Sequence, residues 1–176
     1  MNLPNKLTIG RVIAVPFFIV AFMLEYYLVA LVIFALASLT DMLDGKIARA
    51  QGLVTNFGKI MDPLADKILV YSALCLFIYI KVIAGWTLII ILAREFTVAG
   101  MRTVAASEGR VLAAGMSGKI KTVLQMIAVI VIILALAVPQ VPAIMLVGLV
   151  IFYASLVMTV YSGCEYVIQN KDVFSM

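Results

Sequence analysis

Long apolar stretches without charged residues alternate along the chain with short segments that contain charged residues, glycine or proline. The charge-free intervals are residues 12–24, 26–40, 68–80, 82–93 and 122–164. A helix that crosses a membrane needs about 20 mostly apolar residues, so the shorter intervals must extend into the flanking charged segments. The last interval is long enough for two helices, and the sequence Pro139-Gln140-Val141-Pro142 divides it.

This pattern predicts six helices, at residues 7–24, 27–50, 57–80, 83–107, 116–138 and 143–166. We expect an all-α fold in which these helices cross a membrane as one domain over residues 1–176. Composition supports this expectation, because 65% of the residues are hydrophobic and only 12% are charged, roughly half the charged fraction of a typical soluble protein. A soluble protein of this length could not bury so much apolar surface.

The charged residues predict how the helices are oriented. Threading the chain through six helices places Glu25 and Lys81 at one end and all the other Lys and Arg residues at the opposite end. Cytoplasmic ends of membrane helices are enriched in Lys and Arg, so we expect both termini on the cytoplasmic side. The formal net charge of +4 then reflects topology and anionic ligands, and no nucleic-acid partner is expected.

The residue types present limit the chemistry that the protein can perform. Histidine is absent, which excludes mechanisms that need a histidine base, nucleophile or metal ligand. Cys75 and Cys164 lie far apart in apolar runs and predict neither a CxxC pair nor a disulfide framework.

Four aspartates form two pairs with helical spacing. Asp41 and Asp44 are three residues apart, and Asp62 and Asp66 are four apart, so the members of each pair share one face of a helix. The segment 50–56 contains glycine and polar residues and predicts a turn that brings the two pairs face to face. We therefore expect the active site there, at the cytoplasmic side.

Four carboxylates in one place repel each other and are costly at membrane depth, and divalent cations would relieve the repulsion. Oxygen ligands favour Mg²⁺ or Mn²⁺ over Zn²⁺, and two carboxylate pairs suit a two-metal site that holds phosphate during displacement. Gly45, Ala48 and Gly58 lack bulk, so a ligand can approach closely, and Arg49 is placed to meet phosphate charge. The alternative is that the aspartates are solvated at helix ends or pair with neighbouring lysines.

Residues 41–66 match the pattern D-x2-D-G-x2-A-R-x8-G-x3-D-x3-D at all eight signature positions, and this pattern resembles that of the CDP-alcohol phosphatidyltransferase family. The resemblance implies a six-helix, homodimeric enzyme of a bacterial plasma membrane, in which an alcohol hydroxyl attacks a CDP-linked lipid and CMP leaves. It implies that two divalent cations are bound and that Asp66 is the general base. The implied metal ligands are Asp41, Asp44, Asp62 and Asp66, and the implied CDP-binding residues are Gly45, Ala48, Arg49 and Gly58, to which we add Thr8.

A second group of charged residues points to the acceptor alcohol. The candidate phosphate-binding residues are Arg94, Arg102, Arg110, Lys119 and Lys121. Arg94 and Arg102 are eight residues apart and therefore share a helix face, and so many cations predict an acceptor that itself carries phosphate. Alternatively, the cations serve membrane orientation and bind anionic lipid headgroups. Glu95 either orients an arginine or forms a structural ion pair.

Within the family, residues 94–102 and 118–122 resemble those of members that use CDP-diacylglycerol as donor and sn-glycerol 3-phosphate as acceptor. The segment 5–11 shows the same resemblance, and its Asn5 and Arg11 would support the site. Alternatively, this segment only starts the first helix.

Other functions stay open at this point. Inositol phosphate as the acceptor would also need cations, whereas serine lacks a phosphate and fits the cations poorly. A cation transporter would belong to a different class and would need carboxylates near the membrane midplane with a path to both sides. The sequence instead predicts all four carboxylates near one end.

Overall fold

The computed structural model describes the backbone of residues 3–51, 56–113 and 115–174, and the side chains of residues 8–40, 61, 64–65, 67–113 and 115–173. The helices are α1 (Leu3–Met23), α2 (Tyr27–Gln51), α3 (Asn56–Tyr79), α4 (Gly85–Ser107), α5 (Met116–Ala137), α6 (Pro142–Gln169) and a short 3₁₀ helix η1 (Lys171–Phe174). No strand occurs in these described ranges, and the all-α prediction is confirmed. Each of the six predicted helices overlaps an observed one, and the largest difference is that α1 begins at Leu3 rather than at residue 7.

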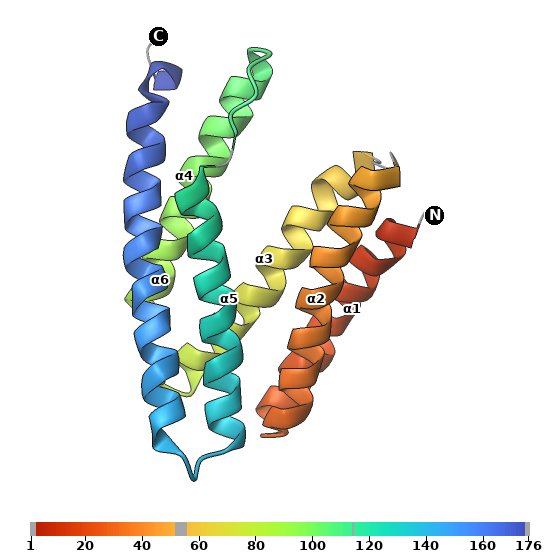
Figure 1. Cartoon of the computed structure of the whole chain (residues 1–176), viewed down its shortest axis with the longest axis vertical. Coiled ribbons are helices and arrows are strands. Elements are labelled where there is room, and N and C mark those ends of the chain that lie inside the picture. Colours follow the sequence, from red (N-terminus) through yellow and green to blue (C-terminus); the bar gives the residue numbers. More distant parts are fainter. Residues whose placement is uncertain (1–2, 52–55, 114, 175–176) are drawn as a thin grey trace.

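The six helices run alternately up and down (Figure 1). The N-terminus, the end of α2, the start of α3 and the C-terminus lie at one end of the molecule, which we call the charged end. The turns from α1 to α2, from α3 to α4 and from α5 to α6 lie at the opposite end. Helix α1 packs against α2 and α3, α6 packs against α4 and α5, and the contact between α2 and α5 joins these two groups.

Two of the turns at the opposite end contain a charged residue in the left-handed backbone conformation. Glu25 has a φ of 61° and Lys81 a φ of 60°. In each turn the next N–H closes the preceding helix, from Tyr26 to the carbonyl of Ala21 (2.9 Å) and from Val82 to the carbonyl of Phe77 (2.8 Å). These turns reverse the chain over few residues, so α1 with α2 and α3 with α4 are connected directly at this end.

The core between α1, α2 and α3 is rich in aromatic side chains, whereas the core between α5 and α6 is mainly aliphatic apart from Phe152. Phe18, Phe34 and Phe77 are fully buried, and Phe18 and Phe34 lie 5.8 Å apart between ring centroids. Between α5 and α6, a Cβ added at Gly148 would lie 2.8 Å from Cγ1 of Ile132, so the missing side chain lets the two helices approach closely. These contacts fix the helices at one end and set their spacing at the charged end.

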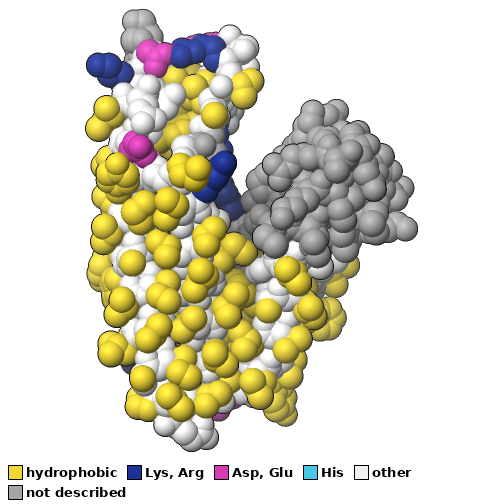
Figure 2. Space-filling model, viewed as in Figure 1, with side chains coloured by type: hydrophobic (Ala, Val, Ile, Leu, Met, Phe, Trp, Pro, Cys, Tyr) yellow, Lys and Arg dark blue, Asp and Glu magenta, His cyan; other side chains and the backbone are white. Residues whose placement is uncertain are grey.

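The exterior of the molecule is strongly apolar. Large apolar side chains are exposed on several helices, for example Phe17 (64%), Ile89 (68%) and Val157 (68%), and Figure 2 shows them covering most of one face while Lys and Arg gather toward the charged end. Monomeric soluble proteins rarely expose such an extended apolar surface. In the described part of the chain, α5 and α6 are long and apolar enough to cross a membrane. The protein is therefore membrane-associated, and the crossing of all six helices stays a prediction.

Candidate active site

The four signature aspartates lie at the charged end of α2 and α3. Asp41 and Asp44 are in α2, and Asp62 and Asp66 are in α3, where the two helices approach the charged end (Figure 1). Their side chains lie outside the described residues, as do those of the other signature positions and of Asn5. Among the side chains that are described, Asp, Glu and Cys form no group of three that could hold a metal ion. The metal and CDP assignments therefore stay predictions, and they depend on the carboxylate donor set, which suits hard divalent cations.

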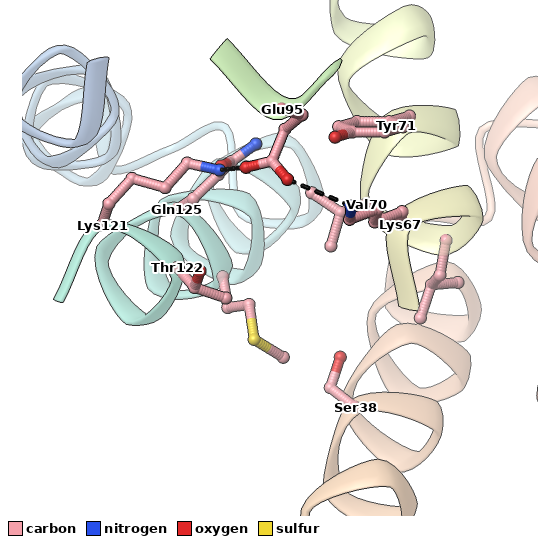
Figure 3. Close-up of a pocket in the computed structure, with 10 residues that line it drawn as sticks. Ser38, Lys67, Val70, Tyr71, Glu95, Lys121, Thr122 and Gln125 are labelled. Carbon is pink, nitrogen blue, oxygen red and sulfur yellow. Dashed lines mark hydrogen bonds and ion pairs between the residues drawn. The ribbon is translucent and has the colours of Figure 1, made fainter. Parts of the chain in front are cut away.

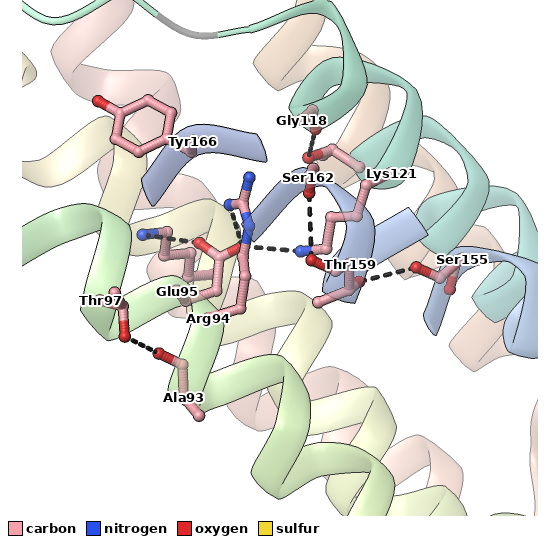
Figure 4. A network of polar contacts seen from close by, with 12 residues as sticks. Ala93, Arg94, Glu95, Thr97, Gly118, Lys121, Ser155, Thr159, Ser162 and Tyr166 are labelled. Atoms are coloured by element: carbon pink, nitrogen blue, oxygen red, sulfur yellow. Dashed lines mark hydrogen bonds and ion pairs between the residues drawn. The ribbon is translucent and has the colours of Figure 1, made fainter. Parts of the chain in front are cut away.

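Next to these helices, Glu95 of α4 is surrounded by cations from three helices. Its Oε1 lies 2.8 Å from Nζ of Lys121 and 3.1 Å from Nη1 of Arg94, and its Oε2 lies 3.2 Å from Nζ of Lys67. We call these four residues the Glu95 cluster; Figure 3 shows Glu95 between Lys121 and Lys67, and Figure 4 shows Arg94 beside Glu95. Among the described side chains, one carboxylate faces three cations, so these four residues carry two more positive charges than negative ones. The pairing of Glu95 with an arginine, which the sequence left as one alternative, is present in the structure.

The cations of the Glu95 cluster differ in exposure. Only 5% of the Lys121 side chain and 13% of the Arg94 side chain are exposed, compared with 43% for Lys67. Placing Lys121 and Arg94 away from water is costly unless a counter-charge is close. Glu95 supplies one negative charge near these cations, and an anionic ligand would supply the remaining negative charge.

Two cavities are lined by Glu95 itself. The smaller, of about 230 Å³, lies between α2, α3, α4 and α5. The larger, of about 790 Å³, is lined mainly by α4, α5 and α6 and includes Arg102 and Lys119. Lys67, Glu95 and Thr122 line both. The structure thus brings Arg94, Arg102, Lys119 and Lys121, which the sequence predicts to bind one acceptor phosphate, to one connected region.

Arg102 is held on the α6 side of the larger cavity. Its Nε donates a hydrogen bond of 3.1 Å to the hydroxyl of Tyr166, and its guanidinium carbon lies 5.5 Å from the centre of that ring. A guanidinium over an aromatic face is stabilised by the charge distribution of the ring. Ser117 donates to Glu165 in the same wall of the cavity. Arg102 is therefore held in place by Tyr166 and not by Glu95.

Arg94 occupies a space that two glycines leave open. A Cβ added at Gly163 of α6 would lie 2.9 Å from Cγ of Arg94, and one added at Gly118 of α5 would lie 3.1 Å from Nη2. Figure 4 shows the Arg94 side chain directed toward these two helices. The Nε of Arg94 is buried and has no hydrogen-bond partner among the described residues. The two glycines therefore determine where the guanidinium of Arg94 can lie.

Arg110 lies apart from both cavities. It follows the end of α4 and pairs with Asp172 of η1, and both side chains are about half exposed. The hydrogen bond and the charge of Arg110 hold the pKa of Asp172 below its usual value. The structure does not bring Arg110 together with the other candidate phosphate ligands, and its role at the acceptor stays a prediction.

Thr8 and Arg11 lie in α1 and are buried, with 0% and 2% of their surface exposed. The Nε of Arg11 donates a hydrogen bond of 3.2 Å to the carbonyl of Ala37 in α2. Ala37 is four residues before Asp41, so Arg11 joins α1 to the helix that carries the first aspartate pair. This contact fits the supporting role predicted for Arg11, while the role of Thr8 toward CDP stays a prediction.

Several residues of this region were not predicted as site residues. Lys67 joins the Glu95 cluster, and Ser38, Tyr71 and Gln125 line the smaller cavity. The signal for Gln125 is visible in the sequence, since it is an amide in the charge-free interval that begins at residue 122.

A polar stripe in α6 shows that a buried hydroxyl near the site need not belong to it. Ser155, Thr159 and Ser162 are buried, but each donates to a carbonyl of its own helix (Figure 4). Intrahelical bonds of this kind satisfy hydroxyl groups without any ligand. These three residues are therefore explained by the helix alone.

Comparison with known proteins identifies the class. The sequence profile of the CDP-alcohol phosphatidyltransferase family matches residues 1–161, and the chain belongs to this family. It is 39% identical, over 97% of its length and 96% of the relative, to the CDP-diacylglycerol–glycerol-3-phosphate 3-phosphatidyltransferase of Bacillus subtilis (strain 168). It is 36% identical to the enzyme of the same name from Rickettsia bellii (strain RML369-C), over 98% of this chain and 97% of the relative. The resemblance drawn from the aspartate pattern is confirmed.

Proposed function

We propose that the protein transfers the phosphatidyl group of CDP-diacylglycerol to sn-glycerol 3-phosphate, giving phosphatidylglycerol phosphate and CMP. The observation that carries this proposal is the Glu95 cluster, a partly buried group with surplus positive charge beside the two helices of the aspartate signature. Relatives whose names state this reaction are 36–39% identical over nearly the whole chain.

The cations suit an acceptor with its own phosphate. A phosphate monoester carries a charge of about −1.5 to −2 at neutral pH, which matches the surplus of two positive charges within the four residues of the Glu95 cluster. Arg102 and Lys119 add further cations from the larger cavity. Each charge-assisted hydrogen bond contributes about 1.5–3 kcal/mol. Serine, which lacks a phosphate, would leave this charge unmatched.

The chemistry proceeds by displacement at phosphorus. Asp66 accepts the proton of the acceptor hydroxyl, the hydroxyl oxygen bonds to the phosphorus attached to diacylglycerol, and the bond from that phosphorus to CMP breaks. Gly45, Ala48, Arg49, Gly58 and Thr8 hold the CDP moiety. Asp41, Asp44, Asp62 and Asp66 would hold two divalent cations, Mg²⁺ or Mn²⁺. When bound, these cations offset the charge of the pyrophosphate and stabilise the charge that develops on CMP.

The six helices cross the plasma membrane of a bacterium, with the charged end on the cytoplasmic side. Tyr26, Tyr79 and Trp86 are exposed near the turns of the opposite end, and exposed aromatic residues are typical of membrane interfaces. In this orientation the nucleotide end of CDP-diacylglycerol reaches the aspartates while its acyl chains stay among the membrane lipids. The protein acts as a homodimer.

The test is an assay of CMP release and lipid product by purified protein in lipid-containing micelles. CDP-diacylglycerol is supplied with glycerol 3-phosphate, glycerol, inositol phosphate or serine. We expect turnover with glycerol 3-phosphate, little with the others, loss of turnover in EDTA and its return with Mg²⁺ or Mn²⁺. A preference for inositol phosphate would contradict the acceptor, full activity after rigorous chelation would contradict the metals, and a transporter would release no CMP.

A further inference from the structure

The smaller cavity contains buried polar groups that no side chain or backbone group in the described part of the chain satisfies. Gln125 of α5 is 97% buried, since only 3% of its surface is exposed, and its Nε2 has no hydrogen-bond partner. The hydroxyl oxygen of Ser38, on α2, is also buried without a partner. Both residues line the cavity, together with three members of the Glu95 cluster. Leaving a buried polar group unpaired is costly, so a ligand that pairs with these groups would bind more tightly.

The unpaired amide of Gln125 lies close to the cations of the Glu95 cluster. Gln125 follows Lys121 by four residues on α5, so the two side chains lie on the same helix face one turn apart. A ligand whose phosphate lies at Lys121 therefore presents its neighbouring atoms to Gln125. Figure 3 shows both residues at one side of the cavity, with Glu95 close by.

Ser38 lies on the side of the same cavity that is nearest to the first aspartate pair. It precedes Asp41 by three residues on α2, so it lies on the face of α2 that carries the first aspartate pair. In Figure 3 the Ser38 hydroxyl points into the cavity from the side opposite Lys121. The cavity thus extends from the predicted phosphate ligands toward the helix that carries predicted metal ligands, with Gln125 and Ser38 on its walls.

We propose that Gln125 and Ser38 form a hydroxyl-binding subsite for the C2 hydroxyl of sn-glycerol 3-phosphate. This proposal rests on the proposed function, and it adds residues that recognise the middle of the acceptor. The phosphate is attached to C3, the reacting hydroxyl to C1, and the C2 hydroxyl lies between them. The amide Nε2 of Gln125 donates to the C2 oxygen, and the C2 hydroxyl donates to the oxygen of Ser38. The acceptor is then fixed at three points, which aligns the C1 hydroxyl for attack.

The test compares two acceptors that differ only in this hydroxyl, glycerol 3-phosphate and 3-hydroxypropyl phosphate. In the unmodified protein we expect kcat/KM to be about 5- to 150-fold higher with glycerol 3-phosphate, the range that corresponds to the cost of leaving a buried polar group unpaired. Gln125→Met keeps the length of the side chain and removes its polar atoms. It should lower kcat/KM for glycerol 3-phosphate by about the same factor and leave the deoxy acceptor within about 2-fold, so the preference disappears.

Gln140→Met is the matched control, because Gln140 lies exposed in the turn between α5 and α6, and it should preserve the preference. Ser38→Ala is a second variant for the case that Gln125→Met does not fold, and it should also reduce the preference. Equal losses with both acceptors in either variant would overturn the subsite. Equal use of both acceptors by the unmodified protein would overturn it as well and leave the proposed function intact, whereas no CMP release with glycerol 3-phosphate would overturn the proposed function itself.

Discussion

Gly163→Ala should move Arg94 without changing any charge in the protein. The added Cβ would lie 2.9 Å from Cγ of Arg94, whereas two carbon atoms attract each other best at about 3.5–4.0 Å. The atom contacted is near the base of the side chain, so Arg94 cannot avoid it by rotating only its guanidinium. The stem of Arg94 must shift, and its contact with Glu95 shifts with it.

The change in stability caused by Gly163→Ala is the sum of two opposing contributions, overpacking and helix propensity. Overpacking a filled space costs about 1–3 kcal/mol, and alanine in a helix interior is more favourable than glycine by up to about 1 kcal/mol. We therefore expect a net loss of stability of roughly 0–2 kcal/mol, small enough for the variant to fold. Losing one charge-assisted contact to the acceptor would raise KM by about 10-fold or more.

The assay measures KM for glycerol 3-phosphate at saturating CDP-diacylglycerol, and KM for the donor at saturating acceptor. Gly163→Ala should raise the first and leave the second nearly unchanged. Gly100→Ala is the matched control, because Gly100 lies in α4 and a Cβ there would meet no atom within 4 Å. It should stabilise the protein by about 0.5–1 kcal/mol with both KM values unchanged. The reasoning is refuted if Gly163→Ala raises both KM values equally, or changes neither while Arg94→Ala raises the acceptor KM.

Three further predictions address the cations, the base and the topology. Arg94→Ala or Lys121→Ala should raise the KM for glycerol 3-phosphate by about 10- to 150-fold with little change in the donor KM; equal effects on both substrates would indicate lipid-headgroup binding instead. Asp66→Asn should lower turnover by at least about 10²-fold in the CMP-release assay, and near-normal turnover would exclude it as base. A cysteine at Gln51 should react only with reagents on the cytoplasmic side and one at Gln140 only from outside; swapped labelling would invert the proposed orientation.

The helices could be predicted because their signal is local. A long charge-free run with few helix-breaking residues can only be satisfied as a helix in an apolar surrounding, and the Pro139–Pro142 segment divides the last run where the structure has a turn. The start of α1 was placed four residues late, because Pro4 and the polar residues after it precede the apolar run. Proline in a first helical turn is compatible with a helix, so the helix extends to Leu3.

The cations could be predicted as a group, but their partners could not. Arg110 lies between Arg102 and Lys119 in the sequence, yet its partner Asp172 is 62 residues away. Lys67 follows the signature aspartate Asp66 directly, and its pairing with Glu95 depends on how α3 packs beside α4. Such pairs are determined by tertiary packing, which local spacing does not encode.

The roles of Gly163 and Gln125 were more difficult to predict from the sequence than those of the cations. Gly163 matters because Arg94, on another helix, fills the space beside it, and no neighbouring residue in the sequence signals this. Gln125 was visible only as a polar residue in an apolar run, and its meaning depends on Ser38, which reaches the same cavity from α2.

The Glu95 cluster also has a consequence for the end of the catalytic cycle. In the proposed reaction the acceptor hydroxyl becomes part of a phosphodiester, but the phosphate that we assign to the cluster does not react and stays on the product. The lipid product therefore carries the same anionic group as the acceptor, now attached to two acyl chains in the membrane. With the acceptor bound as proposed, phosphatidylglycerol phosphate and glycerol 3-phosphate would compete for one set of cations, and departure of the product would require separation from Arg94, Lys67 and Lys121. Removal of that terminal phosphate by a phosphatase elsewhere in the membrane would prevent the released product from rebinding and would draw the reaction forward.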